Sequence, residues 1–201
     1  MKWIAPASAY LAAGFGIFYF HSAWGALIGF HVAISVSLLI AKPNIPVSIL
    51  FEKNDVKWTV LSVLLCGSSG AVLYFLWDAF GFANDLPVQV ASLGLNESNW
   101  LAFIAYFAII NPFIEEYFWR GYLGSKRKSL HTSDFVYAGF HAMILINKVQ
   151  TGSIAFGLCM LVVVGWFWRQ IAREDGGLLA PVLGHAAADF TILFAVYCMV
   201  L

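Results

Sequence analysis

Long apolar runs separated by short polar segments predict seven helices along this chain. A helix that crosses the hydrocarbon core of a membrane needs about 20 mostly apolar residues. The seven predicted helices span residues 3–20, 23–41, 58–80, 100–123, 134–147, 152–172 and 178–201. The fold class expected from this pattern is all-α, a polytopic transmembrane bundle of about seven helices. The run 134–147 is short for a complete span, and no convincing cleavage site follows the first run, so we expect that run to be retained.

The composition supports a single integral membrane domain that covers residues 1–201. Hydrophobic residues make up 61% of the chain, charged residues only 11%, and the mean hydropathy is +0.81. Soluble domains carry about 25% charged residues, so a soluble fold is excluded. The net charge is +0, with no basic tail, and we therefore expect no nucleic-acid partner. The three cysteines match neither a disulfide framework nor a zinc motif.

The positively charged residues predict how the bundle is oriented. Cytoplasmic loops of membrane proteins carry an excess of Lys and Arg. With seven spans, one side receives nine of these residues and the other receives only Lys148, while Arg120 lies within a span. The nine are Lys2, Lys42, Lys53, Lys57, Lys126, Arg127, Lys128, Arg169 and Arg173. The N-terminus is therefore expected on the cytoplasmic side and the C-terminus on the opposite side.

Two adjacent carboxylates, Glu115 and Glu116, interrupt the fourth apolar run. Acidic residues at this depth are costly to insert and usually have a function. Glu116 and Arg120 are four residues apart, so they share a helix face and can neutralise each other. Glu115 lies about 100° around the helix and has no such partner. An unpaired carboxylate inside the membrane is the first candidate for chemistry.

Two histidines are predicted at the same depth as Glu115. His141 and His185 each lie eight residues from the cytoplasmic start of their helices, and Glu115 lies nine residues from the end of its own. At 1.5 Å per residue, all three are roughly 12–14 Å below one surface. Asp189 follows His185 by four residues, so its carboxylate is expected to orient the His185 ring.

Helix breakers and small residues accompany the same positions. Pro112 precedes Glu115 and Pro181 precedes His185, and each is expected to remove a backbone hydrogen bond and bend its helix. Gly139 and Gly184 lie beside the two histidines and are expected to leave space for a backbone or a substrate. A small-residue stretch in the third run, from Gly67 to Gly70, suits close packing of helices.

These residues resemble the motif set of the CPBP intramembrane proteases, the CaaX-protease and bacteriocin-processing (abortive-infection) family. The resemblance rests on Glu115-Glu116-x-x-x-Arg120, a histidine on the next helix, and His185-x-x-x-Asp189. It covers roughly residues 100–196, and the first three helices are only generically similar. Tyr137 stands where the family usually has Phe, and Asp189 stands where Asn is frequent.

The resemblance implies an intramembrane endopeptidase with Glu115 as the general base. It implies that His141 and His185 position the water, stabilise the oxyanion or bind a metal, while Glu116 and Arg120 assist. A Glu115–His141–His185 set can ligate a divalent metal such as zinc, so a metal-dependent and a glutamate-dependent mechanism both stay open. The implied partners are membrane lipid and a membrane-anchored protein or peptide, and the implied location is a bacterial plasma membrane.

Three substrate classes and two other functions also stay open. The substrate is a C-terminal sorting signal, a CaaX-like C-terminus or a peptide leader. Intramembrane Glu, His and Asp also mark ion paths, so a proton- or ion-coupled transporter is an alternative. The chain lacks the inverted repeat that many transporters show. A non-enzymatic membrane immunity or partner protein with the same fold is the second alternative.

Overall fold

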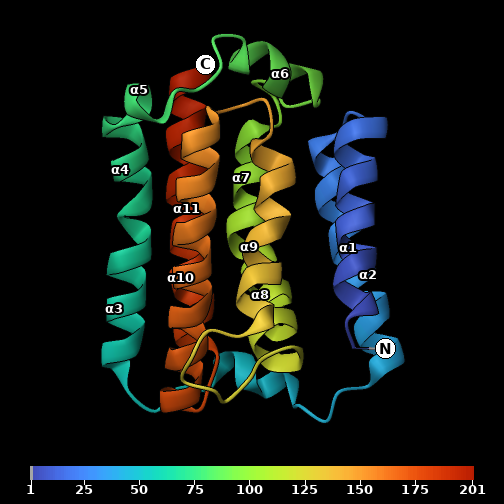
Figure 1. Ribbon diagram of the computed structural model, residues 1–201, viewed down its shortest axis with the longest axis vertical. Coiled ribbons are helices and arrows are strands. Elements are labelled where there is room, and N and C mark those ends of the chain that lie inside the picture. Colours follow the sequence, from blue (N-terminus) through green and yellow to red (C-terminus); the bar gives the residue numbers. More distant parts are fainter. Residues whose placement is uncertain (1) are drawn as a thin grey trace.

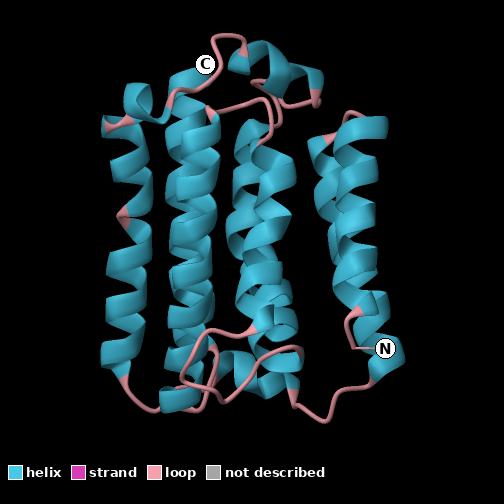
Figure 2. Ribbon diagram, in the orientation of Figure 1, coloured by secondary structure: helices cyan, strands magenta, loops and turns pink. Residues whose placement is uncertain are grey.

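The computed structural model describes residues 2–201 and consists of helices that run up and down along a common direction (Figure 1). Helices and loops account for the described residues, apart from one isolated bridge between Phe82 and Val149 (Figure 2). The elements are α1 (Ile4–Gly14), the π-helix η1 (Phe15–Tyr19), α2 (Ala23–Ala41), the 3-10 helix η2 (Val47–Phe51), α3 (Val56–Gly67), α4 (Ser69–Phe75), α5 (Trp77–Phe80), α6 (Leu86–Ser92), α7 (Trp100–Ile109), α8 (Asn111–Glu116), the π-helix η3 (Tyr117–Tyr122), α9 (Thr132–Leu145), α10 (Thr151–Asp175) and α11 (Leu179–Val200).

Five helical stretches are long and apolar enough to cross a membrane. They are Ala23–Ala41, Val56–Phe75, Trp100–Tyr122, Thr151–Asp175 and Leu179–Val200. The remaining two predicted runs are also helical but shorter, since the first forms Ile4–Tyr19 and the fifth forms the 14-residue α9. The all-α prediction is therefore confirmed, and the protein is an integral membrane protein.

The last helix, α11, lies in the middle of the bundle and packs against α3, α4, α7, α8 and α10. Glycines allow the close approach on its α3–α4 side. A Cβ on Gly70 would lie 2.2 Å from the carbonyl oxygen of Thr191, and one on Gly184 would lie 1.9 Å from Ser62 Oγ. The small residues of the third run therefore serve helix packing, as predicted. Gly184 contacts α3 and leaves no open space for a substrate.

The helix that carries the two carboxylates is interrupted twice. α7 ends at Ile109, and Pro112 then occupies the first turn of α8, where its missing N–H leaves no hydrogen bond unmade. After Glu116 the backbone widens into η3, in which the Leu123 N–H bonds to the Phe118 carbonyl at 2.9 Å. Single π-helical turns are frequent at functional sites. The predicted break at Pro112 is thus confirmed.

The predicted bend at Pro181 is wrong. α11 begins at Leu179, so Pro181 lies in its first turn, where a backbone N–H has no partner within the helix. The helix then runs without interruption to Val200.

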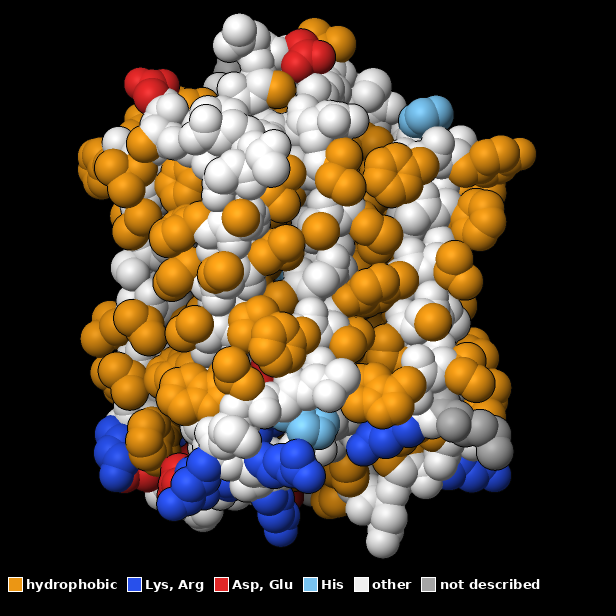
Figure 3. Space-filling view, viewed as in Figure 1, with side chains coloured by type: hydrophobic (Ala, Val, Ile, Leu, Met, Phe, Trp, Pro, Cys, Tyr) orange, Lys and Arg blue, Asp and Glu red, His pale blue; other side chains and the backbone are white. Residues whose placement is uncertain are grey.

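Surface charge and apolar surface are separated along the bundle axis. Figure 3 shows apolar side chains over most of the visible face, with Lys and Arg gathered at the end where the N-terminus lies. The two chain ends lie at opposite ends of the bundle in Figure 1. Arg169, which the sequence analysis counted on the cytoplasmic side at the end of the helix 152–172, is buried, with an exposed fraction of 2%.

Candidate active site

Glu116 lies at the centre of a buried polar cluster. Its Oε1 accepts a hydrogen bond from Arg120 Nη1 at 3.0 Å and another from His185 Nδ1 at 2.8 Å. Its side chain is fully buried, and the Arg120 side chain is nearly so. The predicted pairing of Glu116 with Arg120 is confirmed, and the histidine adds a link from α8 to α11.

Arg120 is further enclosed by two aromatic rings. Its guanidinium carbon lies 4.1 Å from the centroid of Tyr137 and 5.0 Å from that of Trp168. A guanidinium over an aromatic face is held by the negative potential of the ring. The Arg120 side chain is thereby kept in the bundle interior, where it neutralises Glu116.

Glu115 is buried without a cationic partner. Its exposed fraction is 2%, and its Oε2 accepts a hydrogen bond from Trp119 Nε1 at 2.9 Å. Within residues 2–201, no Lys, Arg or His forms an ion pair with this carboxylate, and no protein donor binds its Oε1. The expectation of an unpaired acid at this position therefore agrees with the structure.

His141 is half-buried on α9 and has a defined tautomer. Its Nδ1 lies 3.2 Å from the carbonyl oxygen of Tyr137, one turn earlier, so Nδ1 donates the proton. In a neutral imidazole the other nitrogen, Nε2, then carries a lone pair. His141 can accept a hydrogen bond or a proton at Nε2.

His185 is held mainly by Glu116 and by a stacked indole. Its ring lies on Trp168, with 4.8 Å between centroids and an interplanar angle of 23°. Its Nε2 is 3.5 Å from Asp189 Oδ2, longer than a normal hydrogen bond. Glu116 therefore orients the ring more directly than Asp189 does, contrary to the sequence prediction.

The aromatic ring of Tyr137 lies where the candidate residues meet. Its centroid is 5.3 Å from that of His141, 6.2 Å from that of His185 and 6.0 Å from that of Trp119, the partner of Glu115. The two histidines and the side chains that bind the carboxylates, Trp119 and Arg120, thus surround one buried ring. The sequence identified Tyr137 as a motif position from its spacing to His141. It did not predict that the Tyr137 ring contacts residues of other helices.

Sequence reasoning missed the roles of Asn111, Tyr106 and, largely, His31. Asn111 Nδ2 donates to Asp189 Oδ2 at 3.0 Å, and Asn111 Oδ1 lies 2.9 Å from His31 Nε2. His31 Nδ1 lies 3.2 Å from the Tyr106 hydroxyl. The available signal was a histidine in the middle of the second apolar run.

The start of α9 is fixed by buried charges. Arg169 Nε and Nη2 donate to the two oxygens of Asp134 at 2.9 and 2.7 Å, and Asp134 Oδ2 accepts the His131 N–H at 2.9 Å. Arg169 also donates to backbone carbonyls at residues 125, 127 and 129. Burial, with a further contribution from Arg169, lowers the pKa of His131, whose neutral ring caps the helix by accepting the Ser133 N–H. These contacts determine where α9 places His141.

The candidate residues do not form a metal-binding set. Among residues 2–201, no three His, Cys, Asp or Glu side chains are grouped as metal ligands. The postulated set of Glu115, His141 and His185 is not such a group in the described residues. The site as arranged therefore does not fit zinc, and the chemistry considered below uses protein side chains.

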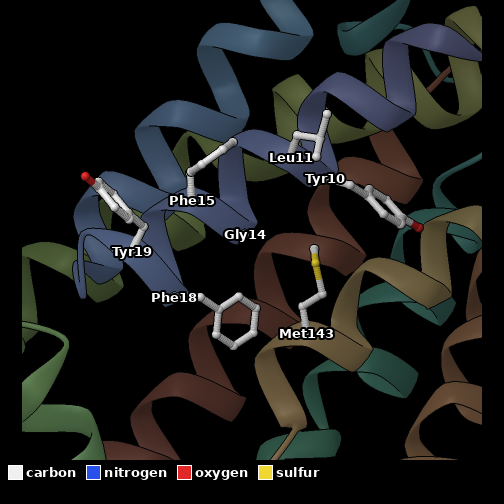
Figure 4. A pocket seen from close by; sticks show the side chains of 7 residues that line it. All are labelled: Tyr10, Leu11, Gly14, Phe15, Phe18, Tyr19 and Met143. Atoms are coloured by element: carbon white, nitrogen blue, oxygen red, sulfur yellow. The ribbon is translucent and has the colours of Figure 1, made fainter.

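An apolar pocket adjoins α9 on the side of the first helix. It has a volume of about 380 Å³ between α1, η1 and α9 (Figure 4). Its lining consists of Tyr10, Leu11, Gly14, Phe15, Phe18, Tyr19 and Met143. The Tyr10 hydroxyl donates to the carbonyl of Val136, and its ring lies 5.8 Å from that of Phe140, the neighbour of His141. The pocket suits an apolar group.

Comparison with known proteins identifies a family. Residues 97–191 match the family model described as Rce1-like, type II CAAX prenyl endopeptidase Rce1-like. No curated protein and no solved structure gives a match. The matched range contains both carboxylates, both histidines and Asp189, whereas His31 and the Tyr10 pocket wall lie outside it.

Proposed function

Because residues 97–191 belong to the Rce1-like type II CAAX prenyl endopeptidase family of peptide hydrolases, we propose that this protein is an intramembrane endopeptidase with Glu115 as its general base. The observation that carries the assignment is the environment of this carboxylate. Glu115 is buried in a helix of spanning length, and among residues 2–201 it has no cationic partner and no donor to its Oε1. Its neighbour Glu116 is bonded through Oε1 to Arg120 and His185, and its Oε2 is buried without a partner among residues 2–201, so we assign Glu116 a structural role as the partner of two cations.

In the proposed reaction, water is held between two acceptors. Glu115 Oε1 and His141 Nε2 each accept a hydrogen bond from the water, which directs its oxygen lone pair toward the scissile carbonyl. Glu115 takes one proton as the C–O bond forms. His185 acts in its imidazolium form: Nδ1–H stays bonded to Glu116, and Nε2–H donates to the developing oxyanion. The proton then passes from Glu115 to the leaving amine as the C–N bond breaks.

The proposed substrate is a protein or peptide anchored in the membrane. Glu115 and His185 lie on helices of spanning length, and the apolar pocket beside the shorter α9 provides a place for an apolar part of the substrate. A C-terminal sorting signal, a CaaX-like C-terminus and a peptide leader all meet this description. The charge distribution favours a cytoplasmic N-terminus, so the substrate enters from that side or laterally from lipid. The proposed location is a bacterial plasma membrane.

Cleavage by purified protein tests this proposal. Wild-type protein, Glu115→Gln and the control Glu97→Gln, which changes an exposed carboxylate, are incubated with a library of membrane-anchored peptides and scored by mass spectrometry. We expect wild type and Glu97→Gln to release the same fragments, with or without a chelator, and Glu115→Gln to release none. Undiminished cleavage by Glu115→Gln would remove this residue from the mechanism. No cleavage by wild type would favour a transporter or a non-enzymatic partner.

A further inference from the structure

A chain of buried polar side chains reaches the site from α2, outside the matched family domain. It runs from Tyr106 through His31 and Asn111 to Asp189, and its distances are 3.2, 2.9 and 3.0 Å. His31 and Asn111 have exposed fractions of 4% and 1%. Polar side chains are rare inside membrane helices and usually bind one another when they occur there.

The donors and acceptors of this chain are determined by its end at Asp189. Asn111 Nδ2 donates to the carboxylate, so Asn111 Oδ1 faces His31 and must accept. His31 Nε2 therefore carries the proton, and Nδ1 of the neutral ring accepts from the Tyr106 hydroxyl. Every link points toward Asp189, and the amide of Asn111 has one orientation that satisfies both of its neighbours.

Asp189 Oδ2 lies between two possible donors. Asn111 Nδ2 is at 3.0 Å and His185 Nε2 is at 3.5 Å. When the Asn111 amide is held in place, it keeps the carboxylate from closing onto His185. His185 Nε2 then stays available to the substrate, while Nδ1 remains bonded to Glu116.

We propose that His31 is a positioning residue of the active site, which fixes the Asn111 amide and so holds Asp189 away from His185 Nε2. The proposal rests on the proposed peptidase function. It gives α2 a direct part in a site whose other members come from residues 97–191. Loss of the His31 donor lets the amide rotate, and Asp189 then competes with the substrate oxyanion for His185.

Two substitutions at one position separate positioning from packing. His31→Phe keeps a buried ring but removes both nitrogens, whereas His31→Gln retains an amide donor that reaches Asn111. Partners that orient a site residue contribute about 10–100-fold to activity. We expect His31→Phe to lower kcat about tenfold or more with KM within about twofold, and His31→Gln to recover most of the loss. The control Ser37→Ala lies on the same helix, bonded to Ser8, and should match wild type.

A second measurement is independent of proteolysis. The imidazole ¹⁵N signals of His31 and His185 are recorded in lipid nanodiscs and assigned with His31→Gln and His185→Gln. We expect His31 to show a protonated Nε2 and a lone pair on Nδ1, and the His185 signals to shift in His31→Phe but not in Ser37→Ala. Unchanged His185 signals in His31→Phe would overturn the proposal, as would undiminished kcat. An inactive wild type with shifted His185 signals would count against the peptidase function while supporting the His31 link.

Discussion

Replacing Glu116 with glutamine is expected to destabilise the bundle far more than the same change at the adjacent Glu115. Glu116 Oε1 receives two hydrogen bonds, from the Arg120 guanidinium and from His185, in a fully buried setting. Hydrogen bonds to charged groups contribute about 1.5–3 kcal/mol each. Removing one partner of a buried ion pair costs about 3–5 kcal/mol, because the remaining charge is left uncompensated. We therefore expect Glu116→Gln to lose about 3–5 kcal/mol of stability.

The same replacement at Glu115 leaves its one protein hydrogen bond intact. The donor is the neutral Trp119 indole, and a glutamine oxygen can accept from it as a carboxylate does. Stability should change by about 1 kcal/mol or less. Hydrolysis should nevertheless fall by about 10²–10⁴-fold, the usual contribution of a general base. Glu116→Gln is therefore expected to lower mainly stability, and Glu115→Gln mainly the rate of hydrolysis.

Thermal unfolding in one detergent, followed by circular dichroism, measures this difference. For globular proteins of similar length, a change of about 1 kcal/mol in the free energy of unfolding shifts Tm by about 2–4 °C. Glu116→Gln should therefore unfold roughly 10 °C below wild type, and Glu115→Gln within a few degrees of it. Equal Tm values for the two variants would refute the assignment of Glu116 to a structural ion pair and of Glu115 to chemistry.

Four further outcomes follow from individual contacts. Tyr137→Phe keeps the central ring, so its Tm and cleavage rate should stay close to wild type, and a loss of activity would assign a role to the hydroxyl. Arg169→Met leaves Asp134 buried without its cation and should lower stability by about 3–5 kcal/mol, with faster proteolysis of the loop at 125–131. Gly184→Ala places a methyl group against α3 and should lower Tm by an amount equivalent to about 1–3 kcal/mol. The folded-state pKa of His131 is below its unfolded value. The neutral His131 ring therefore makes its full contribution to the free energy of unfolding at about pH 7.5, and this contribution is lost as pH falls through about 6.5 toward the folded-state pKa. Tm should drop more on acidification in wild type than in His131→Asn, which caps without titrating.

Much of the architecture and part of the site were predictable because they depend on local sequence. Helix length and hydropathy are properties of consecutive residues, so all seven predicted runs are helical. The Glu116–Arg120 pair has i,i+4 spacing and forms as predicted. The same count along the helix indicated that Glu115 has no cation on its own helix face. The break before Pro112 also required nothing beyond its place inside an apolar run.

Contacts between distant segments were decided only by the tertiary structure. The partner of His185 is Glu116, 69 residues away, and the partner of Asp189 is Asn111, 78 residues away. Pro181 does not bend α11, because that helix begins only two residues earlier, at Leu179. The N–H of Leu178, just before the helix, bonds to the carbonyl of Ile49 in η2 at 2.8 Å. Spacing along a helix determines which residues share a face. The helix that such a face contacts depends on how side chains of different segments pack together in the interior. This packing determined the surroundings of Glu115.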